Sequence, residues 1–119
     1  MPKISVIIKV RNESEFLERC LDSVFSSNLD SKNFEVIIVD SESEDGSLEI
    51  IKKFPVKLLK FDKKSLFSPP ASVYLGLKHS SGDYQFVLDG DMLLDPDWLK
   101  FASEKLDTDN SLVMVAGNR

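Results

Sequence analysis

The stretch Ile4-Ser5-Val6-Ile7-Ile8-Lys9-Val10 decides the fold class, because it is β-branched and almost continuously apolar. A strand that is covered on both faces of a sheet has this composition. The apolar run stops at Arg11-Asn12-Glu13. Residues 4–10 are therefore predicted to form a buried strand of a parallel sheet.

A helix is predicted directly after this strand. Apolar residues recur at helical spacing and form one stripe, which comprises Phe16, Leu17, Cys20, Leu21, Val24 and Phe25. Asn12 and Glu15 stand three positions apart, as in a capping pair at a helix start. We therefore expect a helix of about 13 residues that begins after Asn12.

The alternation of strand and helix continues along the chain. Further strands are predicted at residues 34–39, 56–61, 84–88 and 112–116, and further helices at 48–54, 71–79 and 96–106. Asp95 as cap and Pro96 at the first helical position mark the start of the last helix. The order βαβαβαβαβ predicts an α/β fold, with a mostly parallel sheet, right-handed crossovers and helices on both faces. Residues 1–119 are expected to form a single domain.

Composition and charge restrict the classes of function. The chain has 119 residues, a net charge of −5 and a pI of about 4.8, so nucleic acid is not an expected partner. An anionic ligand would need a local device such as a bound cation. The single cysteine, Cys20, excludes an internal disulfide framework and suits a reducing, cytoplasmic compartment. Neither a signal peptide nor a membrane-spanning apolar run is expected.

Polar clusters follow the ends of three predicted strands, at Arg11-Asn12, at Asp40 to Asp45 and at Asp89 to Asp91. The carboxyl ends of parallel strands lie on one edge of the sheet, and ligands bind in the crevice there. These clusters are therefore expected to converge, although they lie far apart in the sequence.

The motif Asp89-Gly90-Asp91 is the strongest candidate for chemistry. Two carboxylates one residue apart can bind Mg²⁺ or Mn²⁺, which fill their other positions with water and substrate phosphates. Gly90 leaves room for a ligand near the backbone. A solvated turn is the simpler interpretation of this motif alone. Asp45 could cap the following helix, whereas the carboxylate of Asp40 needs a partner such as a ribose hydroxyl or a base N–H.

Taken together, these motifs resemble the family 2 glycosyltransferases of the GT-A fold. The residues that carry the resemblance are Ser5-Val6-Ile7-Ile8, Asn12-Glu13, the helix segment 17–24, Val39-Asp40 through Asp45-Gly46-Ser47, Gly82-Asp83-Tyr84 and Leu88-Asp89-Gly90-Asp91. Their order and spacing agree with the family from about Ser5 to Trp98. Each motif alone is weak, but the ordered set is specific.

The resemblance implies that this chain is the nucleotide-sugar-binding, donor half of a sugar-transferring enzyme. Val10, Asn12, Glu13 and Asp40 would contact the nucleotide of a UDP- or GDP-sugar. Asp89 would bind the ribose or the metal, and Asp91 would ligate Mg²⁺ or Mn²⁺ at the diphosphate. The acceptor is not identified by the sequence, and peripheral membrane association of the full-length protein is an open expectation.

The chain departs from the family pattern at several positions. Lys9 stands where the family usually has proline, and Glu42 and Glu44 replace small or hydroxyl residues. No basic-Asn pair precedes Gly76. The family's general base lies beyond the length of this chain, so no catalytic residue is assigned; four later acids do not match it by position, namely Asp95, Asp97, Asp107 and Asp109.

Two alternatives remain at this stage. The chain could be a truncated nucleotide-binding or non-catalytic module that forms a homodimer through an exposed edge strand. A haloacid-dehalogenase-type phosphatase would use Asp89 as its nucleophile. That fold requires a lysine and an acidic pair well downstream, whereas only 28 residues follow Asp91.

Overall fold

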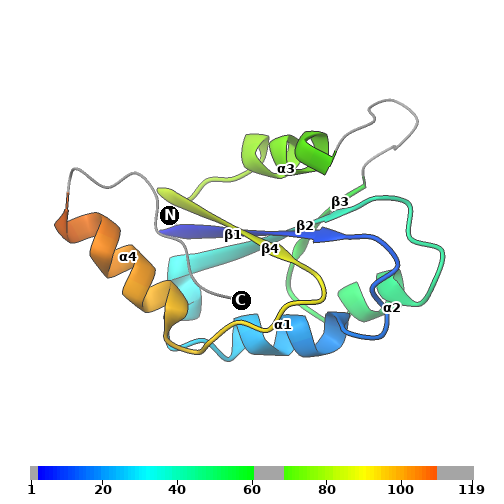
Figure 1. Ribbon diagram of the computed structural model, residues 1–119, viewed down its shortest axis with the longest axis horizontal. Helices are drawn as coiled ribbons and strands as arrows, with labels where there is room; N and C mark the ends of the chain where they lie inside the picture. The colour runs from blue at the N-terminus through cyan, green and yellow to red at the C-terminus, as the bar shows by residue number, and fades with distance from the viewer. Residues whose placement is uncertain (1–2, 61–68, 110–119) are drawn as a thin grey trace.

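The computed structural model describes residues 3–60 and 69–109 (Figure 1). Its elements, in chain order, are β1 (Ile4–Val10), α1 (Leu17–Phe25), the 3-10 helix η1 (Ser31–Asn33), β2 (Phe34–Asp40), α2 (Ser47–Ile51), β3 (Lys57–Lys60), α3 (Pro69–Lys78), β4 (Tyr84–Asp89) and α4 (Trp98–Thr108). The strand predicted at residues 112–116 lies outside the described residues.

The four strands form one sheet in the order β3-β2-β1-β4, and every neighbouring pair is parallel. β1 is central, which accounts for its apolar sequence, because it is covered on both faces and paired on both sides. The register places Val10 opposite Asp40 and Lys9 opposite Asp89. The predicted α/β class with a parallel sheet is confirmed.

Helices cover both faces of the sheet, as Figure 1 shows, with α3 on one side and α1 and α2 on the other. Successive residues of β1 point to opposite faces. Ile8 packs in the larger core with Leu21 of α1 and Leu99 of α4. Ile7 packs with Ile37 on the opposite face, below α3. Within the described ranges, no helix has the length and apolar character needed to span a bilayer.

The helix α3 lies unusually close to the sheet at Gly76. A Cβ atom at this position would be 2.5 Å from Cγ2 of Ile7 and 3.3 Å from Cγ2 of Val39. A side chain here would therefore displace the buried layer between α3 and the strands.

The amino-terminal edge of the sheet is held together by the carboxylate of Glu35. The Ser5 hydroxyl donates to it over 2.5 Å, and the Ser81 backbone N–H donates over 2.7 Å. Burial alone would raise the pKa of Glu35, but the hydrogen bonds from Ser5 and Ser81 outweigh it and lower that pKa. Gly82 follows directly, and a Cβ there would lie 2.7 Å from the Ser5 nitrogen. The glycine in the Gly82-Asp83-Tyr84 motif thus allows the backbone before β4 to approach the backbone of β1 closely.

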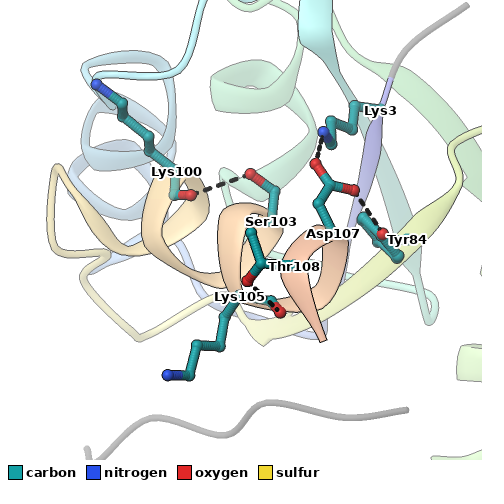
Figure 2. A network of polar contacts seen from close by, with 7 residues as sticks. All are labelled: Lys3, Tyr84, Lys100, Ser103, Lys105, Asp107 and Thr108. Atoms are coloured by element: carbon teal, nitrogen blue, oxygen red, sulfur yellow. Dashed lines mark hydrogen bonds and ion pairs between the residues drawn. The ribbon is translucent and has the colours of Figure 1, made fainter. Parts of the chain in front are cut away.

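The last turns of α4 are tied to the same edge through Asp107 (Figure 2). Lys3 forms an ion pair with one carboxylate oxygen of Asp107, and the Tyr84 hydroxyl donates to the other over 2.7 Å. The hydrogen bond from Lys3 lowers the pKa of Asp107, while the hydrogen bond to Asp107 raises the pKa of Tyr84. One acid therefore joins α4 to the start of β1 and of β4.

Two predicted helix starts are wrong. The helix α1 begins at Leu17, with Phe16 at the N-cap position and no side-chain cap. Asn12 does not cap it, because its φ of 51° and its hydrogen bonds place it in the loop network described below. In α4 the N-cap is Asp97, since Asp95 instead accepts the Asp97 N–H in a turn that precedes the helix.

Candidate functional site

The ends of β1, β2 and β4 meet at the carboxyl edge of the sheet, as the sequence predicts. Asp40 is the partner of Val10 on one side of β1, and Asp89 is the partner of Lys9 on the other. Two strand spacings separate Asp40 from Asp89, a distance of about 10 Å. The structure therefore brings together the three polar clusters that follow these strands.

Two serine hydroxyls join the loop after β1 to the loop after β2. Ser43 Oγ accepts the Asn12 backbone N–H over 2.9 Å and donates to Asp40. Ser47 Oγ accepts the Glu13 backbone N–H over 3.0 Å and donates to Asp45. Each serine thus links a main-chain donor of the first loop to a carboxylate of the second.

Asn12 and Asp45 complete the junction between the two loops. The side-chain oxygen of Asn12 accepts the Glu44 backbone N–H over 2.8 Å. Asp45 accepts the backbone N–H of Ser14 through one oxygen and that of Ser47 through the other. These hydrogen bonds, with the Ser47 hydroxyl contributing most, depress the pKa of Asp45. Asp45 thus stabilises the start of α2, although Gly46 holds the N-cap position.

Asp40 is buried, with a relative exposure of only 2%. One of its oxygens accepts the Ser43 hydroxyl, and the other accepts the Ser43 backbone N–H over 3.1 Å. The hydrogen-bonding partner that this carboxylate requires is therefore supplied within the chain.

The Asp89-Gly90-Asp91 motif lies directly against the loop after β1. The Gly90 backbone N–H donates to the Lys9 carbonyl oxygen over 3.1 Å. A Cβ at Gly90 would lie 3.3 Å from Cγ of Glu13 and 3.3 Å from Cγ2 of Val10. Gly90 therefore permits a close contact between the motif and two of the predicted nucleotide-binding residues.

The electrostatics show that the acids gather here. Burial raises the pKa of Glu13, and the charges of Asp91 and Asp89 raise it further. Burial also raises the pKa of the Cys20 thiol to about 12, with Asp91 and Glu13 adding to the effect. Cys20 is buried in the apolar stripe of α1, so it is a core residue, as its spacing predicts.

The donor set suits a cation that takes few protein ligands. Asp91 is exposed, and the side chain of Asp89 is 37% exposed. Among the residues that the structure describes, no three His, Cys, Asp or Glu side chains converge into a preformed metal cluster. Mg²⁺ and Mn²⁺ accept one or two carboxylates and complete their shell with water and phosphate oxygens. Two acids of the motif meet that requirement.

Sequence reasoning missed the contacts made by three residues. Lys9 departs from the family pattern, and its Nζ lies 3.1 Å from Oδ1 of Asp89. Ser43 and Ser47 were part of a polar loop with no individual role. Their spacing from Asp40 and Asp45 was the available signal, because serine commonly bonds backbone groups near acidic turns.

A parallel sheet with this acidic carboxyl edge defines a class of α/β proteins that bind ligands in the crevice at the strand ends. The chain belongs to glycosyl transferase family 2, which it matches over residues 5–119. The family resemblance predicted from the motifs is confirmed, and the phosphatase alternative loses its basis.

Curated relatives are similar over most of this chain. Glycosyltransferase AglE of Haloferax volcanii is 33% identical over 106 residues, which are 84% of this chain and 34% of the relative. Poly(ribitol-phosphate) β-N-acetylglucosaminyltransferase TarP of Staphylococcus aureus is 40% identical over 98 residues, 79% of this chain and 30% of that protein. The chain thus spans about a third of the length of the curated relatives that it matches.

Solved structures agree with the fold. S. aureus TarS residues 1–349 superimpose with a TM-score of 0.81 at 26% identity, covering 89% of this chain and 32% of that 1–349 chain. TarS has also been solved in complex with UDP. The mannosyltransferase PcManGT of Pyrobaculum calidifontis, in complex with GDP-Man and Mn²⁺, has a TM-score of 0.77 at 25% identity and covers 88% of this chain and 32% of its own.

Proposed function

We propose that this chain supplies the donor-binding half of a metal-dependent glycosyltransferase, which transfers a sugar from a UDP- or GDP-sugar. The observation that carries the proposal is the meeting of Asp89 and Asp91 with Glu13 at the carboxyl edge of the sheet. The UDP complex of TarS and the GDP-Man complex of PcManGT support a nucleotide-sugar donor. A cytoplasmic location remains part of this proposal.

The proposed division of labour follows from the position of each residue. Asp91, the exposed acid, and Asp89 would hold Mg²⁺ or Mn²⁺. When bound, that cation would supply Lewis-acid stabilisation of the leaving diphosphate. The loop that carries Asn12 and Glu13 would bind the nucleotide, with its backbone fixed by Ser43 and Ser47. Asp40 and Val10 would form the floor beneath the base or ribose, because both are buried at the strand ends.

Two of the four later acids, Asp97 and Asp107, are bonded to other side chains of the chain. Asp107 is bonded to Lys3 and Tyr84 at the opposite edge, and Asp97 accepts a hydrogen bond from Asn28. The catalytic base and the acceptor are left unassigned. Peripheral membrane association and homodimer formation also remain proposals for the full-length protein.

The proposal predicts metal-dependent nucleotide binding by the 119-residue chain. Calorimetric titration with UDP and GDP, with and without Mn²⁺, should show binding that Mn²⁺ strengthens. Asp91→Asn should remove the strengthening by Mn²⁺, because one anionic metal ligand is lost. The nucleotide affinity measured with Mn²⁺ should then fall roughly tenfold. Asp40→Asn should weaken nucleotide binding even without metal.

The matched control is Asp83→Asn, which removes the same charge just before β4. Asp83 is exposed and lies about 20 Å from Asp89 along the strand, so binding should be unchanged. If the folded chain binds neither nucleotide, the donor-site proposal is wrong. Binding without sugar transfer or donor hydrolysis would favour the alternative of a non-catalytic nucleotide-binding module.

A further inference from the structure

Lys9 occupies a central position at the carboxyl edge. It is the penultimate residue of the central strand and is the register partner of Val39 in β2 and of Asp89 in β4. Because side chains alternate along a strand, Lys9 emerges on the same face as Ile7, the face covered by α3. Its cationic group is thus directed over the sheet towards the first acid of the Asp89-Gly90-Asp91 motif.

Lys9 holds this motif through both its side chain and its main chain. Nζ of Lys9 lies 3.1 Å from Oδ1 of Asp89, and both side chains are only about one-third exposed, at 32% and 37%. The Lys9 carbonyl oxygen accepts the Gly90 backbone N–H over 3.1 Å. The position of Asp89 therefore depends on Lys9, whereas Asp91 is exposed two residues further on.

The ion pair has a direct consequence for a divalent cation. A metal that binds Asp89 must share the carboxylate with the ammonium group of Lys9 or displace it, and like charges at that separation repel. A nucleotide diphosphate changes this balance, because its oxygens ligate the metal and also attract the lysine. A free metal ion therefore finds Asp89 paired with Lys9, whereas a metal ion that binds with the diphosphate finds Asp89 released from that pair.

We propose that Lys9 is a positioning residue that withholds Asp89 from free divalent cations, so that the metal and the nucleotide diphosphate bind together. This inference rests on the proposed donor site. It assigns to Lys9 the coupling between the two ligands.

The test measures that coupling with Mn²⁺ and UDP. The free Mn²⁺ signal in electron paramagnetic resonance, corrected for the Mn²⁺ that UDP binds in a protein-free titration, gives the Mn²⁺ dissociation constant with and without saturating UDP. Lys9→Met keeps the apolar stem and removes the charge. It should tighten binding of Mn²⁺ alone by roughly tenfold, and by less when UDP is present. The ratio of the two dissociation constants should fall accordingly, and by reciprocity the effect of Mn²⁺ on UDP affinity should fall equally.

Two further variants control for charge and for folding. Lys53→Met makes the same change in net charge at an ion pair with Glu18, where the N–O distance is also 3.1 Å but the side chains are 63% and 52% exposed. It should leave Mn²⁺ binding unchanged. Lys9→Arg retains the cation and should keep the wild-type coupling, while circular dichroism verifies that each variant is folded.

The possible outcomes separate the inference from the proposed function. If wild type binds UDP with Mn²⁺ but Lys9→Met binds free Mn²⁺ no more tightly, the inference is overturned and the donor site stands. If Lys53→Met has the same effect as Lys9→Met, general charge explains the result and the inference is again overturned. If neither wild type nor Lys9→Met binds Mn²⁺ with UDP, both proposals are wrong.

Discussion

At the scale of single residues, Ser43 joins the two loops of the candidate site. Its hydroxyl donates to the buried carboxylate of Asp40 and accepts the backbone N–H of Asn12. A single small side chain therefore fixes a strand-end acid and a loop that follows a different strand. Asn12 adopts a left-handed φ of 51°, which asparagine tolerates better than most residues, and this conformation lets its amide oxygen accept the Glu44 N–H.

The variant Ser43→Ala tests this role. We expect the free energy of unfolding to fall by about 1–2 kcal/mol, because a buried carboxylate loses one donor and a backbone N–H loses its acceptor. Urea denaturation measures the change. Ser80→Ala is the control, since the Ser80 hydroxyl donates to the Leu77 carbonyl oxygen at an exposed helix end. If both variants lose the same free energy of unfolding, the junction role proposed for Ser43 is wrong.

At the scale of secondary structure, the contact between α3 and the sheet determines how that face is packed. Gly76 allows the helix backbone to approach Ile7 of β1 and Val39 of β2. Leu75 and Leu59 pack beside the same cluster. The apolar pattern of residues 71–79 predicts a helix, but the close approach depends on the one position in α3 that lacks a Cβ.

We expect Gly76→Ala to lower the free energy of unfolding by about 1–3 kcal/mol, despite the better helix propensity of alanine. The new methyl group would lie 2.5 Å from a buried Ile7 atom, so the layer must shift. Gly46→Ala is the matched control, because its Cβ would meet Ser14 Cβ at 3.9 Å and its φ is −80°. Chemical denaturation of both variants should show a large loss only for Gly76→Ala.

At the scale of the whole molecule, the two edges of the sheet carry different kinds of contact. The carboxyl edge carries the acids of the candidate site. The amino-terminal edge holds distant segments together, since Glu35 of β2 bonds Ser5 of β1 and Ser81 before β4. Asp107 adds α4 to this edge through Lys3 and Tyr84 (Figure 2).

The lowered pKa of Glu35 predicts a pH-dependent contribution to stability. A carboxylate whose pKa is depressed in the folded state stabilises the fold above its unfolded pKa, and that contribution is lost as the pH falls through the folded value. Glu35→Gln should therefore lower the free energy of unfolding by about 1 kcal/mol at pH 7. The difference from wild type should shrink as the pH falls below 4.5, the ordinary value for this group.

Thermal unfolding between pH 3 and pH 7 measures this effect. Glu49→Gln, an exposed substitution on α2, makes the same change in charge and should alter stability little at any pH in this range. A difference for Glu35→Gln that stays constant across the pH range would contradict the role of the ionised carboxylate.

Much of the architecture follows from residue pattern. The β-branched runs at residues 4–10 and 34–39 identify the two inner strands, because only residues of this kind suit a strand buried on both faces. The alternation with helices requires parallel pairing, and parallel pairing places Asp40 and Asp89 at one edge. The helix starts were harder to predict. In the turns before α1 and α4, other hydrogen bonds replace the capping that the sequence pattern suggests.

Local pattern thus suffices for the fold class and for the edge at which Asp40, Asp89 and Asp91 meet, since both depend on side-chain periodicity and chain direction. It does not suffice for the partners of these residues. Only the folded chain pairs Asn12 with Glu44 and Lys9 with Asp89. Such contacts depend on which loops the sheet brings together, across separations of up to 80 residues, and spacing along the sequence carries no information about them.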